Sequence, residues 1–255
     1  QENPRKEALE AVPEGGYLIL DLFSDGSPKW ADGYEGHDFL WCMLHNFGGR
    51  TGMHGRLEST MGGYFDALEK YPEDMKGIGA TPEGIETNPI LYDALFELPW
   101  MEKDECGGWI DRYVTARYGT PDSSMTEGWK LLASSVLNCP TAQQGVSEPV
   151  VCARPSLEVR SVSEWSTCAI YHDTGKVRNA ASLMLKEKES FRDNLNYGHD
   201  IVDVVRQALT DSSYVLLAQI EESWKKGDRK EFRKGYEAFL EMIEDMDRLL
   251  STSGL

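Results

Sequence analysis

The sequence predicts an α/β region followed by an α-helical region. Three short apolar runs, at residues 17–23, 38–44 and 75–80, alternate with helical patterns in the first hundred residues. Beyond them only helical patterns occur. Short apolar strands that alternate with helices are typical of a parallel sheet covered by helices. We therefore expect a parallel α/β region over residues 1–104 and an α-helical region over residues 105–255.

The first two apolar runs predict buried strands. Residues 17–23 read Tyr-Leu-Ile-Leu-Asp-Leu-Phe and end at a loop that contains Gly26 and Pro28. Residues 38–44 form the second run, which leads into the polar, glycine-rich segment 45–49. Residues 55–70 then place apolar side chains at helical spacing, so a helix is expected to return from this segment.

The third apolar run ends at a carboxylate. Small and apolar residues run from 75 to 80, and Pro82 and Gly84 then flank Glu83. Proline and glycine stop a strand and force a turn, so Glu83 is expected at a strand tip. In an α/β barrel the strand tips carry the catalytic groups. Glu83 is therefore a candidate catalytic carboxylate, and the alternative is an ordinary solvated loop residue. A further helix is expected from Pro89.

The second half predicts helices only. Their expected ranges are 109–118, 123–137, 180–191, 193–226 and 229–250, with a loop-like stretch over 141–155. The last two are long, and a Lys-Lys-Gly-Asp sequence at 225–228 separates them. We expect these two helices to pack antiparallel across that turn.

Composition excludes several classes of protein. The chain has 255 residues, a formal net charge of −17 and a pI near 4.7. Such an acidic surface repels nucleic acid and anionic membranes. No run of 18 apolar residues predicts a membrane span. The polar N-terminus lacks the pattern of a signal peptide, and the early strand suggests that the chain begins within a domain.

Five cysteines lie scattered without any CxxC pair, which indicates neither a zinc ribbon nor a dense disulfide framework. The sequence leaves open whether one or two disulfides form. His37 and His54 form no ligand pair at metal spacing, so no metal and no cofactor is expected.

Two motifs at the strand tips are specific. They are Phe39-Leu-Trp-Cys-Met-Leu-His-Asn-Phe-Gly-Gly49 and Gly79-Ala-Thr-Pro-Glu-Gly-Ile85, and together they resemble the alpha-N-acetylglucosaminidases of glycoside hydrolase family 89. The resemblance continues, in the family's order and approximate spacing, through Arg117–Gly119, Ser135–Cys139, Arg154–Leu157 and Tyr197–Gln207. It therefore covers nearly the whole chain.

This resemblance implies a fold and an activity. Residues 1–104 would be the C-terminal part of a (β/α)8 TIM barrel, and residues 105–255 an incomplete α-helical domain. The activity implied is that of a retaining exo-glycosidase that releases terminal α-linked N-acetylglucosamine from glycans of the heparan-sulfate or mucin type. Glu83 matches the family's nucleophile, whereas no position matches its acid/base. The parent protein would be lysosomal, periplasmic or extracellular.

Four residues are candidates for sugar binding. A tryptophan can stack on a sugar face, and imidazole or amide groups can bond its hydroxyl or N-acetyl groups. The candidates are Trp41, His45, Asn46 and Asn88. Asn88 lies just past Glu83 and is a weaker candidate, as is Tyr92. Trp41 is equally compatible with a core position. Strand alternation would turn Trp41 and His45 to one side and Asn46 to the other.

A retaining glycosidase needs two carboxyls roughly 5–5.5 Å apart, and Glu83 supplies one. Asp21, Asp25 and Glu86 are the other acidic residues near strand tips, and none fits the family pattern. Glu86 suits a helix N-terminus.

In the helical region, Trp165, Tyr171 and His172 would either close the pocket or pack a seam between domains. His199 and Asp200, with Asp203 and Arg206, predict an ion-paired structural face.

Two other functions stay open. The chain could be a catalytically incompetent fragment that binds sugar or pairs with another chain, or a helical interaction domain with a vestigial α/β segment. Three strands leave open edges and an uncovered apolar face. We therefore expect a second polypeptide, or the missing N-terminal half of a longer protein, to complete the barrel.

Overall fold

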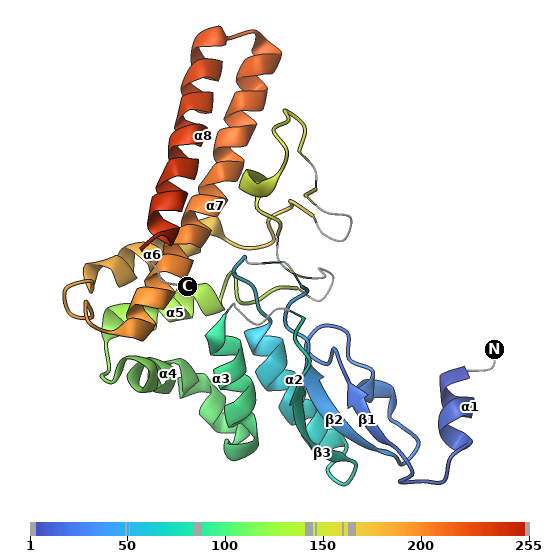
Figure 1. The fold of residues 1–255 in the computed structure, drawn as a ribbon. Coiled ribbons are helices and arrows are strands. Elements are labelled where there is room, and N and C mark those ends of the chain that lie inside the picture. Colours follow the sequence, from blue (N-terminus) through green and yellow to red (C-terminus); the bar gives the residue numbers. More distant parts are fainter. Residues whose placement is uncertain are drawn as a thin grey trace. The chain divides into compact units, whose positions relative to one another are not determined.

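The computed structural model describes residues 4–48, 50, 52–83, 88–140, 145, 147–159, 161–162 and 167–252 (Figure 1). The chain divides into two compact units. The first comprises residues 1–109 and 137–145, and the second comprises residues 110–136 and 146–255. No helix in the described ranges is both long and apolar enough to cross a membrane.

The first unit is built on a parallel sheet of three strands. β1 (Leu18–Asp21), β2 (Asp38–Met43) and β3 (Met75–Ala80) lie in the order β1-β2-β3. Leu20 is paired with Leu40, and Leu40 is paired with Gly77 on its other side. All three predicted strands and their parallel pairing are confirmed. Their carboxyl ends therefore meet at one edge of the sheet.

Helices cover one face of this sheet. α2 (Leu57–Lys70) packs on β2, and α3 (Pro89–Glu97) packs on β3 and α2 (Figure 1). The buried side chains of β2 are Phe39, Trp41, Cys42 and Met43. They form a core with Met61 and Phe65 of α2 and Leu91 and Leu95 of α3. α1 (Pro4–Glu10), which the sequence did not predict, buries none of its residues.

Leu18 and Leu20 of β1, and Leu22 just after it, are exposed, so the prediction of a buried first strand is wrong for this chain. Leu18 is 56% exposed, Leu20 51% and Leu22 53%. A parallel strand becomes buried only when both faces are covered. β1 lies at an edge of the sheet, and none of the residues that the structure describes forms a layer over these leucines.

β3 and β2 approach each other closely at a glycine. A Cβ placed on Gly79 would lie 2.6 Å from Sγ of Cys42, well inside normal contact distance. This close approach explains why the strand that precedes Glu83 contains glycine at this position.

The segment after α5 returns to the first unit. Arg56 and Asn138 form an isolated antiparallel bridge. The N–H of Leu57 donates to the carbonyl of Leu137 (2.9 Å), and that of Cys139 donates to the carbonyl of Gly55 (2.8 Å). This pairing explains why residues 137–145 belong with the sheet and not with the helices.

The second unit is helical, as predicted. Its elements are α4 (Trp109–Tyr118, whose first residue belongs to the first unit), α5 (Ser123–Ala133), α6 (Thr174–Lys186), α7 (Leu195–Lys226) and α8 (Arg229–Leu250). α7 and α8 form the expected hairpin across Gly227, whose φ of 70° is left-handed and therefore suits glycine (Figure 1). The expected range 180–191 is wrong. The carboxylate of Asp173 accepts the N–H groups of Gly175 and Lys176, and this cap starts the helix at Thr174.

Candidate active site

Polar side chains gather where the three strands end. Asp21 is the last residue of β1, and Asp25 follows four residues later. His45 and Asn46 follow β2, and Glu83 follows β3. Because the strands are parallel, these residues lie along one edge of the sheet, which is where α/β proteins place their functional groups.

Asp25 and Arg56 form a buried ion pair beneath this edge. Nη1 of Arg56 lies 3.6 Å from Oδ2 of Asp25, and both side chains are 1% exposed. The Asp25 carboxylate also accepts the N–H groups of Leu44 (2.9 Å) and His45 (3.2 Å). Burial raises the pKa of Asp25, while these donors and Arg56 act to lower it. Asp25 therefore fixes the backbone at the end of β2.

His45 is the centre of a buried hydrogen-bond network. Its Nε2 lies 3.0 Å from the carbonyl of His54, and its Nδ1 lies 3.1 Å from the hydroxyl of Tyr92. A carbonyl can only accept, so Nε2 carries the proton and Nδ1 accepts from Tyr92. Burial lowers the pKa of His45 to about 4. The imidazole is therefore neutral at pH 7.

Asn88 connects the start of α3 to His54, whose carbonyl is a partner of His45. Its Oδ1 accepts the N–H of His54 (3.3 Å), and its side chain is 3% exposed. His45 and Asn88 both have left-handed backbones, with φ of 63° and 57°. Such conformations are uncommon for residues other than glycine and persist where surrounding bonds hold them.

Glu83 is held by the segment that follows β2. Its backbone N–H donates to the carbonyl of Asn46 (3.4 Å), and its Oε2 accepts the N–H of Gly48 (3.2 Å). The side chain of Asn46 is turned inward, where Nδ2 donates to the carbonyl of Arg50 (2.6 Å). Glu83 itself is exposed. The edge of the sheet thus carries an exposed Glu83 carboxylate, which is held by a segment whose residues His45 and Asn46 are buried.

The other acidic candidates are engaged elsewhere or lie outside the described residues. Oδ2 of Asp21 accepts the N–H groups of Lys29 (2.8 Å) and Trp30 (2.7 Å), so this carboxylate closes the loop after β1. Asp25 is buried against Arg56. Glu86 falls outside the part of the chain that the structure describes.

Trp41 occupies the core. Its side chain is fully buried, and its indole lies against Gly63 of α2. The expectation that Trp41 and His45 face the same side is based on strand alternation, which does not apply to His45, because this residue lies beyond the end of β2 with a left-handed backbone.

The aromatic candidates of the second unit are engaged in packing. His172 is 2% exposed, and its Nε2 lies 3.0 Å from Oδ1 of Asp211. The hydroxyl of Tyr171 donates to the carbonyl of Val136 (2.6 Å). Trp165 lies outside the described residues.

The predicted ion-paired face is confirmed. Arg117 binds Asp200 through Nε and Nη2 at 2.5 and 2.7 Å, and the hydroxyl of Tyr118 donates to the same carboxylate at 2.7 Å. The pKa of His199 is raised by its contact with Asp200. Arg206 pairs with Asp203. Two motifs far apart in the sequence are therefore one structural cluster.

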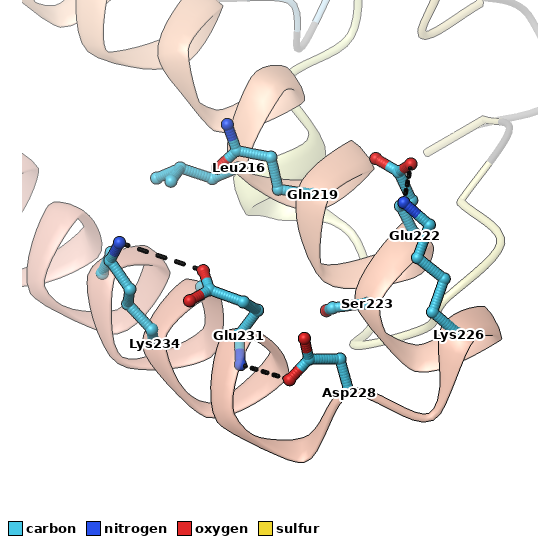
Figure 2. Close-up of a pocket in the computed structure, with 10 residues that line it drawn as sticks. Leu216, Gln219, Glu222, Ser223, Lys226, Asp228, Glu231 and Lys234 are labelled. Atoms are coloured by element: carbon cyan, nitrogen blue, oxygen red, sulfur yellow. Dashed lines mark hydrogen bonds and ion pairs between the residues drawn. The ribbon is translucent and has the colours of Figure 1, made fainter.

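Two hollows on the α7–α8 hairpin do not have the features of an active site. One, of about 420 Å³, contains paired charges: Glu222 with Lys226 and Glu231 with Lys234 (Figure 2). The other, of about 440 Å³, is mainly apolar. In the part of the chain that is described, no group of three or more His, Cys, Asp or Glu side chains could hold a metal ion. All five cysteines are free thiols.

Sequence reasoning missed two supporting residues, Arg56 and Gly48. Arg56 lies just before α2, where an arginine is usually solvated, and its sequence neighbours give no sign of burial. Gly48 acts through its backbone N–H, which every residue except proline carries.

Comparison with known proteins agrees with this arrangement. The profile of the alpha-N-acetylglucosaminidase (NAGLU) tim-barrel domain matches residues 1–102, and that of the NAGLU C-terminal domain matches residues 109–254. Human alpha-N-acetylglucosaminidase is 33% identical over 212 residues, which cover 81% of this chain and 28% of the human protein.

Solved structures give the same result. A family 89 glycoside hydrolase from Clostridium perfringens, in complex with 2-acetamido-1,2-dideoxynojirmycin, superposes with a TM-score of 0.90 at 31% identity. The match covers 98% of this chain and 29% of that protein. A variant of the Clostridium enzyme, with two glutamates replaced by glutamine and its substrate GlcNAc-alpha-1,4-galactose bound, superposes with a TM-score of 0.89.

The fold and these matches define the class: the chain comprises the C-terminal part of a TIM barrel followed by an α-helical domain, related to family 89 glycoside hydrolases. It spans less than a third of the length of the relatives that it matches. The chain belongs to the alpha-N-acetylglucosaminidase (NAGLU) family.

Proposed function

We propose that this chain carries the nucleophile of a retaining exo-glycosidase that releases terminal α-linked N-acetylglucosamine. Glu83 is the nucleophile, in a barrel segment over residues 1–104, and residues 105–255 form the helical domain. The family membership supports the reaction class, and the Clostridium relative has GlcNAc-alpha-1,4-galactose as its substrate. The substrates proposed here are glycans of the heparan-sulfate or mucin type.

One observation carries the proposal: the Glu83 carboxylate is exposed at the carboxyl edge of the sheet, with one oxygen held by a backbone N–H. A nucleophile must be accessible and oriented. In the first step a Glu83 oxygen attacks the anomeric carbon, and the electron pair of the glycosidic bond passes to the leaving oxygen, which the acid protonates. Water then hydrolyses the glycosyl ester with retention.

Neither Asp21 nor Asp25 is proposed as the acid/base carboxyl that works with Glu83. Both are held by backbone N–H groups, and Asp25 is also paired with Arg56. We propose that a second polypeptide, or the remaining part of the parent protein, supplies the acid/base and completes the barrel. The exposed leucines of β1 support the need for a completing segment, because apolar side chains of a parallel strand are normally buried under a covering layer. We propose a lysosomal, periplasmic or extracellular compartment for the parent protein.

The same exposed leucines favour a second candidate function. In it the chain alone is catalytically incompetent and acts as a module that binds sugar or pairs with another chain. The two candidates differ in whether the purified chain turns over substrate.

The test combines activity with native mass. Hydrolysis of a chromogenic α-N-acetylglucosaminide is measured for wild type, Glu83→Ala and the control Glu73→Ala. Glu73 is also exposed but precedes β3, at the opposite end of the strand from Glu83. Activity that Glu83→Ala lowers by several orders of magnitude, and that Glu73→Ala leaves unchanged, supports the nucleophile. Equal loss in both variants contradicts it. A lone 28.7 kDa species without activity favours the second candidate.

A further inference from the structure

The segment 44–48 after β2 is the part of the molecule that touches Glu83 on both its backbone and its side chain. The carbonyl of Asn46 accepts the N–H of Glu83, and the N–H of Gly48 donates to Oε2. His45 and Asn46, the sugar-binding candidates in this segment, have buried side chains that are hydrogen-bonded within the protein. We therefore consider another role for them.

We infer that segment 44–48 is a positioning device for the nucleophile, in which the Gly48 N–H holds Oε2 of Glu83 and leaves Oε1 to attack the sugar. This inference rests on the proposed role of Glu83. A backbone donor suits the task, because it is fixed by the fold and needs no side-chain rotamer to be ordered. In the attack, the new bond joins Oε1 to the anomeric carbon, while the leaving group departs with its electron pair.

His45 is the positioning residue that keeps the segment in place. Its left-handed backbone turns the chain out of β2, and Asp25 accepts both the Leu44 and the His45 N–H groups at this turn. Its imidazole is locked between the His54 carbonyl and the Tyr92 hydroxyl. Loss of these bonds frees the turn, and with it the two contacts to Glu83. A displacement of about 1 Å at a reacting group costs roughly a hundredfold in rate.

Gly48 offers a matched pair of variants. Gly48→Pro removes the N–H, whereas Gly48→Ala keeps it. A Cβ on Gly48 would lie 3.6 Å from the carbonyl oxygen of Glu83 and 3.8 Å from its Oε2, which is ordinary contact. Alanine is therefore accommodated. Gly48→Pro lacks the donor and also fixes φ, so a second measurement that does not use this variant is needed.

The reaction is followed with a 5-fluoro-α-N-acetylglucosaminyl fluoride. Fluoride leaves without a proton, so trapping of Glu83 as a glycosyl ester does not need the acid/base, and the modified peptide is located by mass. We expect the trapping rate constant of Gly48→Pro to fall about a hundredfold relative to Gly48→Ala. The reagent concentration at half-maximal rate is expected to stay within about threefold, because the lost bond acts on the nucleophile and not on sugar binding.

A second measurement does not depend on turnover or on the folding of Gly48→Pro. In protein labelled with ¹⁵N-glycine, the Gly48 amide proton is expected to lie downfield and to move upfield in Glu83→Gln, since a bond to a carboxylate is stronger than one to an amide. Gly79, in the adjacent strand, serves as the internal control. His45→Gln is expected to move the Gly48 resonance in the same direction and to lower the trapping rate.

The outcomes separate the inference from the proposed function. Trapping of wild type at Glu83 with equal rates for Gly48→Pro and Gly48→Ala overturns the inference and leaves the function intact. A Gly48 amide that does not respond to Glu83→Gln overturns the inference whatever the trapping result. A responsive amide without trapping of wild type supports the contact and favours the second candidate function, in which the chain alone is catalytically incompetent.

Discussion

Acid is expected to destabilise the first unit, because His45 is buried in its neutral form. Burial lowers the pKa of His45 from the ordinary value of 6.5 to about 4. Between these values the unfolded chain binds a proton that the folded chain does not. The contribution of neutral His45 to stability is therefore complete above pH 6.5 and is lost progressively as the pH falls towards 4.

The size of the loss follows from this shift. One unit of pKa shift corresponds to about 1.4 kcal/mol, so the interval from 6.5 to about 4 amounts to roughly 3 kcal/mol in the free energy of unfolding. His54 adds to the loss, since burial and the nearby Arg56 lower its pKa as well. Asp25 acts in the opposite sense, because its pKa is raised and its protonation relieves a buried charge.

The assay isolates His45 from these neighbours. Amide hydrogen exchange of peptides from β2 is measured from pH 7.5 to 4.5, corrected for the intrinsic exchange rate, and converted to an opening free energy. We compare wild type with His45→Gln. The pH dependence is expected to be shallower by about 1.4 kcal/mol per pH unit in His45→Gln. Equal slopes for wild type and His45→Gln would refute the reasoning.

Three further predictions concern stability. Arg117→Ala leaves the Asp200 carboxylate buried without its bidentate partner and should cost about 3–5 kcal/mol in urea unfolding. The double variant with Asp200→Ala should recover part of this loss, and strict additivity would contradict the coupling. Trp41→Ala empties a fully buried position and should cost about 3–5 kcal/mol, whereas a stability within 1 kcal/mol of wild type would count against the core assignment. Asp173→Ala removes the cap of α6 and should cost about 1 kcal/mol, while Asp173→Asn retains most of it; equal losses in thermal unfolding would show that the cap is not the cause.

The sheet could be predicted from the sequence because each strand is a short apolar run that ends at a polar or glycine-rich turn. The parallel pairing follows once such runs alternate with helices. The burial of β1 could not be predicted, because it depends on a layer that covers Leu18 and Leu20 and not on the residues themselves. Likewise the start of α6 is set by the side chain of Asp173, whereas the pattern pointed to Gly175 as a break.

The position of Glu83 at a strand tip could be predicted from the sequence, whereas the orientations of the polar residues around it could not. Pro82 and Gly84 mark Glu83 as a strand-tip residue in the sequence. The orientations of His45, Asn46 and Asn88 depend on backbone angles and on partners 4 to 47 residues away, which periodicity does not encode. Their polar character suggested contact with a sugar, whereas in the structure their hydrogen bonds are made within the protein.

The hydrogen bonds around Glu83 all join residues in the first hundred of the chain. Asp25 and Leu44 are 19 residues apart, Gly48 and Glu83 are 35 apart, and His45 and Tyr92 are 47 apart. Loop-closure entropy grows only slowly with length, so the longest of these loops costs little more to close than the shortest. During synthesis the chain emerges from its N-terminus, so all these partners are available once α3 has been made. The hydrogen bonds that hold Glu83 can therefore form while the helical unit is still being translated.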